Sequence, residues 1–260
     1  MGVAESTFPH PKQWRIPGID KDLDLVTDVR DLTREWARRS SKPPTCIGKW
    51  EERLGELPWA NIGQRYTAGL CSPKCFGSHY KCVLHRALLC APHNDELPSD
   101  KCRFCQAHRE SLVHLGSCPA LRPVYQALRL LDGGSRWDDV PLNLLGVTGQ
   151  HTIRGAVSAA HFHVWKFVIL MLRDMTERVI PNPTASILRS ASERLENKIA
   201  AVRHRLVRYR RRCELRRLQP CYDTYNRWLE GAAEIDEDGE VSVTPQYAKW
   251  VAATQPWTSG

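Results

Sequence analysis

This chain of 260 residues has no long uninterrupted apolar run. The longest, Phe167–Leu172, has six residues, whereas a membrane-spanning helix needs roughly 18 to 20. The N-terminus also lacks the apolar core of a secretory signal peptide. We therefore expect an intracellular protein, nuclear or cytoplasmic, with no membrane partner.

The common enzyme signatures are missing too. The sequence has no P-loop, no Rossmann glycine fingerprint, no nucleophile elbow and no HExxH motif. The adjacent acids Asp138 and Asp139 stand in W-D-D-V, which does not resemble the metal-binding turn of a polymerase. Two-metal phosphoryl chemistry requires a constellation of carboxylates. We therefore expect no catalytic residues and no enzymatic activity.

Ten cysteines occur without a secretory signal, which indicates reduced thiols and metal ligands rather than disulfides. Four residues follow the pattern C-x2-C-x8-H-x3-C: Cys102, Cys105, His114 and Cys118. Three thiolates and an imidazole are the ligand set of a structural zinc site. We predict that these residues bind Zn²⁺. Such a site leaves no open position for a catalytic water, which indicates a binding or scaffolding module.

Other cysteines and histidines leave alternatives open. His108 and Cys90 lie close enough in sequence to replace one of the four ligands. A second compact set could hold another metal, although its spacing fits no familiar ligand turn: Cys71, Cys75, His79 and Cys82. For that set we favour buried structural cysteines.

Positive charge is concentrated in one part of the chain. The formal charge is +3 over residues 1–150, +10 over 151–218 and −5 over 219–260. Residues 203–217 contain eight arginines and one acid, Glu214. A basic block of this kind indicates a polyanionic partner, and arginine suits bidentate phosphate contacts.

We predict nucleic-acid contacts, with little sequence specificity, from two groups of basic residues. The first group flanks the cysteine motif and the second lies in the basic block: Lys101, Arg103 and Arg109; Arg203, Arg205, Arg208, Arg210, Arg211 and Arg212. The alternatives are a solvated helix face, docking against the acidic stretch 234–240, and simple compensation of thiolate charge by the first group.

The hydrophobic periodicity predicts a mainly α protein, with helices joined by short turns. We divide the chain into an N-terminal arm and helix (1–44), a helical region with the embedded CCHC zinc knuckle (45–147), a long helical hairpin with a basic second helix (148–218) and an acidic tail with a short β-hairpin (219–260). Helices are expected over 22–39, 50–54, 59–66, 76–89, 119–131, 152–179 and about 185–218, with Asn182 as a helix N-cap and the β-hairpin over 234–244.

The stretch 99–119 resembles the zinc-binding region downstream of the polymerase in non-LTR (LINE-type) retrotransposon reverse transcriptases. That family tends to read C-x2-C, then E-[ST]-x2-H-L, then C-P, and here Glu110-Ser111, His114-Leu115 and Cys118-Pro119 occupy those places. The resemblance covers roughly residues 45–180, with looser matches around Trp50 and Tyr80. The spacing from histidine to the last cysteine is three residues, where the family more often has four.

The resemblance implies a C-terminal module that holds RNA or DNA for a polymerase. The polymerase and endonuclease domains are not in this sequence, so a separate reverse transcriptase chain would be a second partner. Two alternatives are a zinc-stapled protein-interaction module and a decayed retroelement fragment. An exposed apolar seam of Leu195, Val202 and Leu206 would favour the interaction module. The same seam buried against residues 152–179, with arginines outward, would favour nucleic acid.

Overall fold

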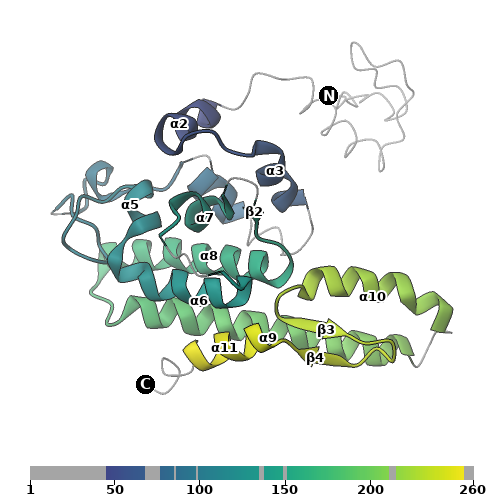
Figure 1. Cartoon of the computed structure of the whole chain (residues 1–260). Coiled ribbons are helices and arrows are strands. Elements are labelled where there is room, and N and C mark those ends of the chain that lie inside the picture. Colours follow the sequence, from purple (N-terminus) through teal and green to yellow (C-terminus); the bar gives the residue numbers. More distant parts are fainter. Residues whose placement is uncertain are drawn as a thin grey trace, which may run out of the picture. The chain divides into compact units, whose positions relative to one another are not determined.

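A computed structural model of the chain describes residues 45–67, 77–84, 86–97, 99–134, 138–148, 151–210 and 215–254. The described part is mainly helical with two short two-stranded sheets, which confirms the predicted fold class (Figure 1). The chain divides into units 1–49 and 50–260, and the description below concerns the second unit, apart from one helix that begins before it. The expected arm and the helix over 22–39 lie outside the described residues.

Two short helices, α2 (Thr45–Leu54) and α3 (Trp59–Thr67), confirm the helices expected on either side of Gly55 and Pro58. The helix expected over 76–89 is shorter than predicted, because the π-helix η2 (Tyr80–Leu84) is its last turn. Arg86 then takes a left-handed conformation with φ 56°. The N–H groups of Ala87 and Leu88 close onto carbonyls six residues earlier, so the helical hydrogen-bond ladder stops there.

The central region contains a one-turn 3-10 helix, η3 (Ala91–His93), followed by α5 (Leu112–Ser117), the 3-10 helix η4 (Pro119–Leu121), α6 (Arg122–Asp132) and α7 (Val140–Leu145). Together, η4 and α6 confirm the helix expected over 119–131. It ends at Gly133, whose φ of 69° is a left-handed conformation that favours glycine. The helix α7, which starts at an Asp139 N-cap, was not predicted from the sequence.

A close backbone approach joins α5 to α7. A Cβ atom on Gly116 would lie 2.7 Å from Leu144 Cγ, so only glycine fits between the two helices. The side chain of Asn143 donates a hydrogen bond to the Gly116 carbonyl at 2.8 Å. This contact fixes α5 against the core.

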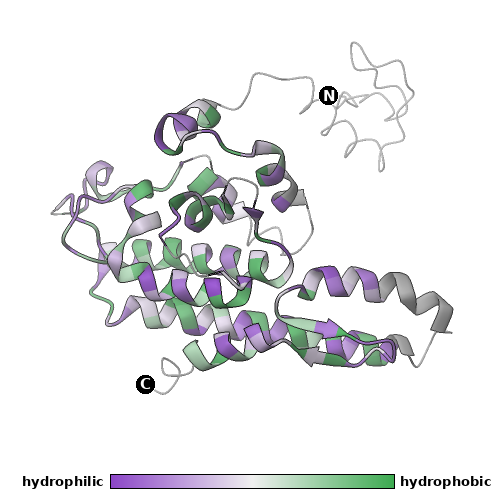
Figure 2. Cartoon of the chain, in the orientation of Figure 1, coloured by the Kyte–Doolittle hydropathy of each residue, from purple (hydrophilic) through white to green (hydrophobic). Residues whose placement is uncertain are grey.

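A short β-hairpin, β1 (Val147–Thr148) and β2 (His151–Thr152), leads into the helical hairpin of α8 (Gly155–Glu177) and α9 (Pro183–Arg210). This helical hairpin confirms the predicted one. Asn182 Oδ1 accepts from the Ala185 N–H at 3.2 Å, which confirms the N-cap. The helices α6, α8, α9 and α11 (Pro245–Thr254) pack together around the main core, and Figure 2 shows α8 as mainly hydrophobic.

The prediction of one continuous helix to residue 218 was wrong. α9 ends at Arg210, and α10 (Leu215–Leu229) packs back against both α8 and α9 (Figure 1). α9 is 28 residues long and α8 is 23, so the end of α9 extends beyond its partner helix. The reversal allows α10 to bury Tyr222, Tyr225 and Leu229 in that space.

The expected C-terminal β-hairpin is confirmed. Its strands are β3 (Ala233–Ile235) and β4 (Val241–Val243), which pair antiparallel. Gly239 supplies the left-handed turn residue with φ 72°. The following α11 was not predicted, and it buries Tyr247 and Trp250.

By length and composition alone, α8 could cross a membrane. In the structure, 67% of its most apolar stretch is buried inside the protein. Phe162 and Trp165, for example, are almost inaccessible to solvent. This is the environment of a core helix.

Candidate metal centre

The four predicted ligands come together. The ligand atoms of Cys102, Cys105, His114 and Cys118 all lie within 4.8 Å of one another. The first two lie in one turn, His114 lies on α5, and Cys118 separates α5 from η4. The Ser111 hydroxyl caps α5 by accepting from the His114 N–H at 3.0 Å. The structure therefore forms a Cys3His cluster that could bind a metal ion.

A tight backbone turn presents the first two cysteines. Lys101 and Arg109 form an antiparallel bridge at its base, and the Cys102 N–H donates to the His108 carbonyl at 2.7 Å. Gln106 follows Cys105 with a φ of 56°, an uncommon conformation for a residue other than glycine. Its side-chain amide donates to the Arg103 carbonyl at 3.1 Å, which helps to hold the turn.

The spacing of the ligand atoms fits a single tetrahedral ion. The Sγ atoms of Cys102 and Cys118 are 3.8 Å apart, and Cys105 Sγ lies 3.4 Å from His114 Nε2. Zinc–ligand distances in a tetrahedral site place two sulfurs about 3.8 Å apart and a sulfur and a nitrogen about 3.6 Å apart. The geometry also identifies Nε2 as the ligating nitrogen of His114.

The pKa shifts favour the metal-binding form at Cys118 and His114 and disfavour it at Cys102. The hydrogen bond between Cys102 and Cys118 raises the pKa of Cys102 and lowers the pKa of Cys118; burial raises both. One thiol therefore acts as the donor and the other as a thiolate-like acceptor. Burial, followed by the charge of His108, lowers the pKa of His114. A lowered pKa favours neutral imidazole, which is the form that binds metals.

Neither alternative ligand belongs to the cluster. Burial and then the charge of Glu110 raise the pKa of Cys90 to about 11, so its thiol stays protonated near neutral pH. His108 is exposed, with its ring centroid 5.3 Å from that of His114. In this arrangement the ligand set is the one predicted from the sequence.

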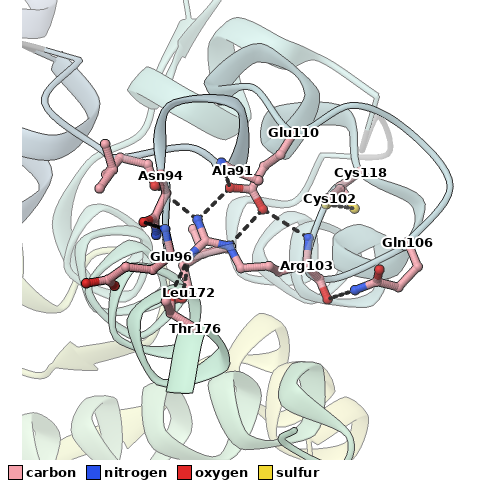
Figure 3. Close-up of polar contacts among 11 residues, drawn as sticks. Ala91, Asn94, Glu96, Cys102, Arg103, Gln106, Glu110, Cys118, Leu172 and Thr176 are labelled. Atoms are coloured by element: carbon pink, nitrogen blue, oxygen red, sulfur yellow. Dashed lines mark hydrogen bonds and ion pairs between the residues drawn. The ribbon is translucent and has the colours of Figure 1, made fainter. Parts of the chain in front are cut away.

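A buried ion pair joins two residues that lie between the candidate ligands in the sequence, and it was not predicted. Arg103 donates from Nε and Nη2 to the two carboxylate oxygens of Glu110, at 3.0 and 2.5 Å (Figure 3). The two residues are only 7% and 1% exposed. The prediction that Arg103 contacts phosphate was therefore wrong, because its guanidinium lies inside the protein.

This pair connects the cysteine turn to distant parts of the fold. Arg103 Nη1 donates to the Leu172 carbonyl at 2.6 Å and to the Thr176 hydroxyl at 3.0 Å, both on α8. Glu110 accepts from the Ala91 N–H at 2.8 Å (Figure 3). The orientation of the turn therefore depends on α8 and on the start of η3. Glu110 falls on the E-S-x2-H-L pattern, which was the one available sequence signal for it.

The remaining cations beside the cluster face solvent. Lys101 is exposed, and Arg109 is 71% exposed while forming an ion pair with Asp100 at 3.3 Å. Neither contacts the ligand atoms in the described part of the chain. Both stay available as surface charges.

The α9 arginines predicted to contact nucleic acid also face outward as far as they are described. Arg203, Arg205 and Arg208 are exposed, and Arg203 donates to the Val241 carbonyl of β4 at 3.1 Å. The predicted residues Arg211 and Arg212, and the side chain of Arg210, lie outside the described residues. The contact to Val241 means that the hairpin covers part of this face.

The second cysteine set is described only in part, because Cys71 and Cys75 lie outside the described residues. His79 is fully buried and pairs through Nε2 with the Leu144 carbonyl at 2.8 Å. Burial, and then the charge of Arg65, lower its pKa to about 3. Burial raises the pKa of the Cys82 thiol. Within the described part of the chain, His79 and Cys82 belong to no metal cluster.

Comparison with known proteins gave no match to this chain among protein-family models, curated proteins or solved structures. The resemblance to non-LTR retrotransposon reverse transcriptases therefore rests on the sequence motif alone and stays a prediction.

Proposed function

We propose that this protein is a zinc-stapled helical module that binds nucleic acid through the outward face of α9. One observation carries the proposal. Leu195, Val202 and Leu206 are 0%, 3% and 1% exposed, so the apolar seam is used inside the fold. The arginines between these positions are exposed. A seam already covered by the protein's own helices is not free to pair with a partner helix.

Zinc is the metal that suits the cluster. Three thiolates and one imidazole, all supplied by the protein, are typical of a structural Zn²⁺ site. When bound, the ion would supply a four-way crosslink among the cysteine turn, α5 and the start of η4. Cys102, Cys105, His114 and Cys118 would hold it.

The face of α9 supplies the contacts to phosphate. Guanidinium groups donate paired hydrogen bonds to phosphate oxygens, and such contacts release counterions. Lys101 and Arg109 add exposed charge near the metal cluster. By its motif, the module would serve as the zinc-binding C-terminal part of a retrotransposon reverse transcriptase, and a polymerase chain would be its partner.

Titration with single-stranded RNA and duplex DNA at several salt concentrations tests the proposal. Replacing Arg205 and Arg208 by glutamine should flatten the salt dependence by about 1.4 to 1.8 units if each contacts one phosphate. The matched control is Arg173→Gln with Arg178→Gln, which removes the same charge from an exposed end of α8. Equal slopes for the two double variants would show that the α9 arginines are only a solvated face.

A further inference from the structure

The start of α8 and the end of α10 meet unusually closely. Gly155, the first residue of α8, has a φ of 48°, and a Cβ there would lie 2.5 Å from Glu230 Cβ and 2.9 Å from the Arg227 carbonyl oxygen. The Ala156 N–H donates to the Glu230 carbonyl at 3.0 Å. Glycine is required at this junction, which places Arg154 of the α8 N-cap beside Arg227 of α10.

A cavity of ≈ 470 Å³ opens beside this junction. Its volume falls within the range of about 300 to 1,000 Å³ that small-molecule sites occupy. Three arginines line it, Arg65, Arg154 and Arg227, against one acid among the described lining residues, Glu230. The cavity is therefore positively charged and suits an anion.

The arginines differ in how they are held. Arg65 is only 4% exposed and donates to the Ser158 hydroxyl at 3.2 and 3.3 Å, and also to the Leu145 carbonyl. Arg154 and Arg227 are exposed and form no ion pair with an acidic side chain in the described part of the chain. Arg227 Nε donates to the Asp223 carbonyl of its own helix at 3.3 Å. The outer two guanidinium groups are thus placed to take a ligand.

A buried hydroxyl points to the same conclusion. Thr152 Oγ1, on the cavity lining, is buried and has no hydrogen-bond partner among the described atoms. Buried polar atoms are nearly always paired, so this one calls for an oxygen or nitrogen from outside the chain. The N-terminus of α8 contributes little to anion binding, because the Glu230 carbonyl already accepts a hydrogen bond from the Ala156 N–H.

An aromatic side chain completes the lining. Trp228 is half-buried, with Tyr225 edge-on at 5.5 Å between ring centroids and Lys198 Nζ 5.9 Å from the ring centre. Guanidinium groups beside an indole suit a phosphate attached to a planar base. We propose that this cavity binds a nucleotide, with its phosphate on Arg154 and Arg227 and its base against Trp228.

This site is separate from the outward face of α9 and does not depend on it. The nucleotide could be a free mononucleotide or the 5′-phosphorylated end of a strand, and both present the same chemistry. Glu230 suits a ribose hydroxyl as a hydrogen-bond acceptor.

Isothermal titration of the full chain would test the proposal, with AMP, adenosine, inorganic phosphate, and one short oligonucleotide with and without a 5′-phosphate as probes. AMP should bind more tightly than adenosine or phosphate. Arg154→Gln with Arg227→Gln should weaken AMP binding by at least about tenfold, since each charge-assisted contact is worth more than one neutral hydrogen bond. Trp228→Leu should remove the preference for AMP over phosphate.

The Arg173→Gln, Arg178→Gln double variant is the control for charge, and circular dichroism is the control for folding. If the 5′-phosphate increases the affinity for the oligonucleotide more than it increases the affinity for AMP over adenosine, the ligand is a strand end. If the gain from adenosine to AMP is the larger one, the ligand is a free nucleotide. AMP binding that is absent, or equal in the parent and the Arg154/Arg227 variant, would overturn the proposal. These results do not test the salt dependence of nucleic-acid binding assigned to Arg205 and Arg208. The cavity proposal and the α9 proposal can therefore each fail without the other.

Discussion

Arg103 and Glu110 face each other inside the cysteine turn, with Arg103 Nη2 2.5 Å from Glu110 Oε1. Arg103 follows the first cysteine ligand and Glu110 precedes the histidine ligand by four residues. A buried ion pair is stable only when its remaining polar atoms are also satisfied, as they are here by α8 and Ala91. The protein itself therefore positions the turn that carries two of the candidate metal ligands.

Loss of the Glu110 carboxylate should be strongly destabilising. Glu110→Ala leaves the Arg103 guanidinium buried without its anion, which should cost about 3 to 5 kcal/mol in the free energy of unfolding. Urea unfolding of metal-loaded protein measures the change. Asp100→Ala, which breaks the exposed pair with Arg109, is the matched control and should cost only about 0 to 1 kcal/mol. Similar losses for the two variants would contradict a structural role for the buried pair.

One zinc ion per chain should be found in protein purified without chelators. Cys105→Ser should release the metal and loosen residues 99–120, because metal binding and local folding are linked. Elemental analysis gives the metal content, and hydrogen exchange reports on the loosening. Cys90→Ser, at a buried thiol outside the cluster, should keep the metal. A clean preparation of the parent with no zinc would rule out the assignment.

Acid should destabilise the fold partly through His163 on α8. Burial, and then the charges of Lys198, Arg194 and Lys166, lower its pKa to about 4. Above pH 6.5 the residue is neutral in both states and its environment carries no penalty. As pH falls from 6.5 to 4 only the unfolded chain takes up the proton, so about 3 kcal/mol of stability should be lost. Below pH 4 this contribution becomes constant.

The measurement is the free energy of unfolding against pH for the parent and His163→Gln. The glutamine variant should lose less stability between pH 6.5 and 4, whereas His204→Gln, at an exposed site on α9, should follow the parent. Parallel curves for the parent and His163→Gln would disprove the assigned role.

The contact between α5 and α7 should tolerate no side chain at Gly116. Gly116→Ala places a methyl group 2.7 Å from Leu144 Cγ, and such overpacking should cost about 1 to 3 kcal/mol. Gly63→Ala is the control, since its Cβ meets nothing within 4 Å and alanine favours the helix by about 1 kcal/mol. Thermal unfolding compares them. A Gly116 variant as stable as the parent would mean that the two helices can separate without cost.

Purified protein should show no metal-dependent polymerase or nuclease turnover. The reason is the missing carboxylate constellation in the sequence. Primer extension and plasmid nicking with Mg²⁺ or Mn²⁺ are the assays, with a known polymerase and a known nuclease as positive controls. Turnover that persisted through stringent purification would overturn this expectation.

Local features of this fold could be predicted from the sequence, and features set by distant contacts could not. The Cys3His cluster depends on spacing within 17 residues, and the caps at Asn182 and Gly133 depend on neighbouring residues. The end of α9 was missed because its apolar heptads continue through Tyr209 and Cys213, while the reversal depends on where α8 begins. Arg103 was misassigned because its carbonyl partner Leu172 is 69 residues away.

The helix α8 connects the two candidate sites and fixes the distance between them. The Leu172 carbonyl of α8 accepts a hydrogen bond from Arg103 in the cysteine turn. The first residue of α8, Gly155, forms the junction beside the arginine-lined cavity. Seventeen residues separate these points, which at 1.5 Å per residue corresponds to about 26 Å along the helix axis. An unbroken helix keeps this separation constant. A proline introduced midway would therefore change the spacing of the two sites without altering any residue in either.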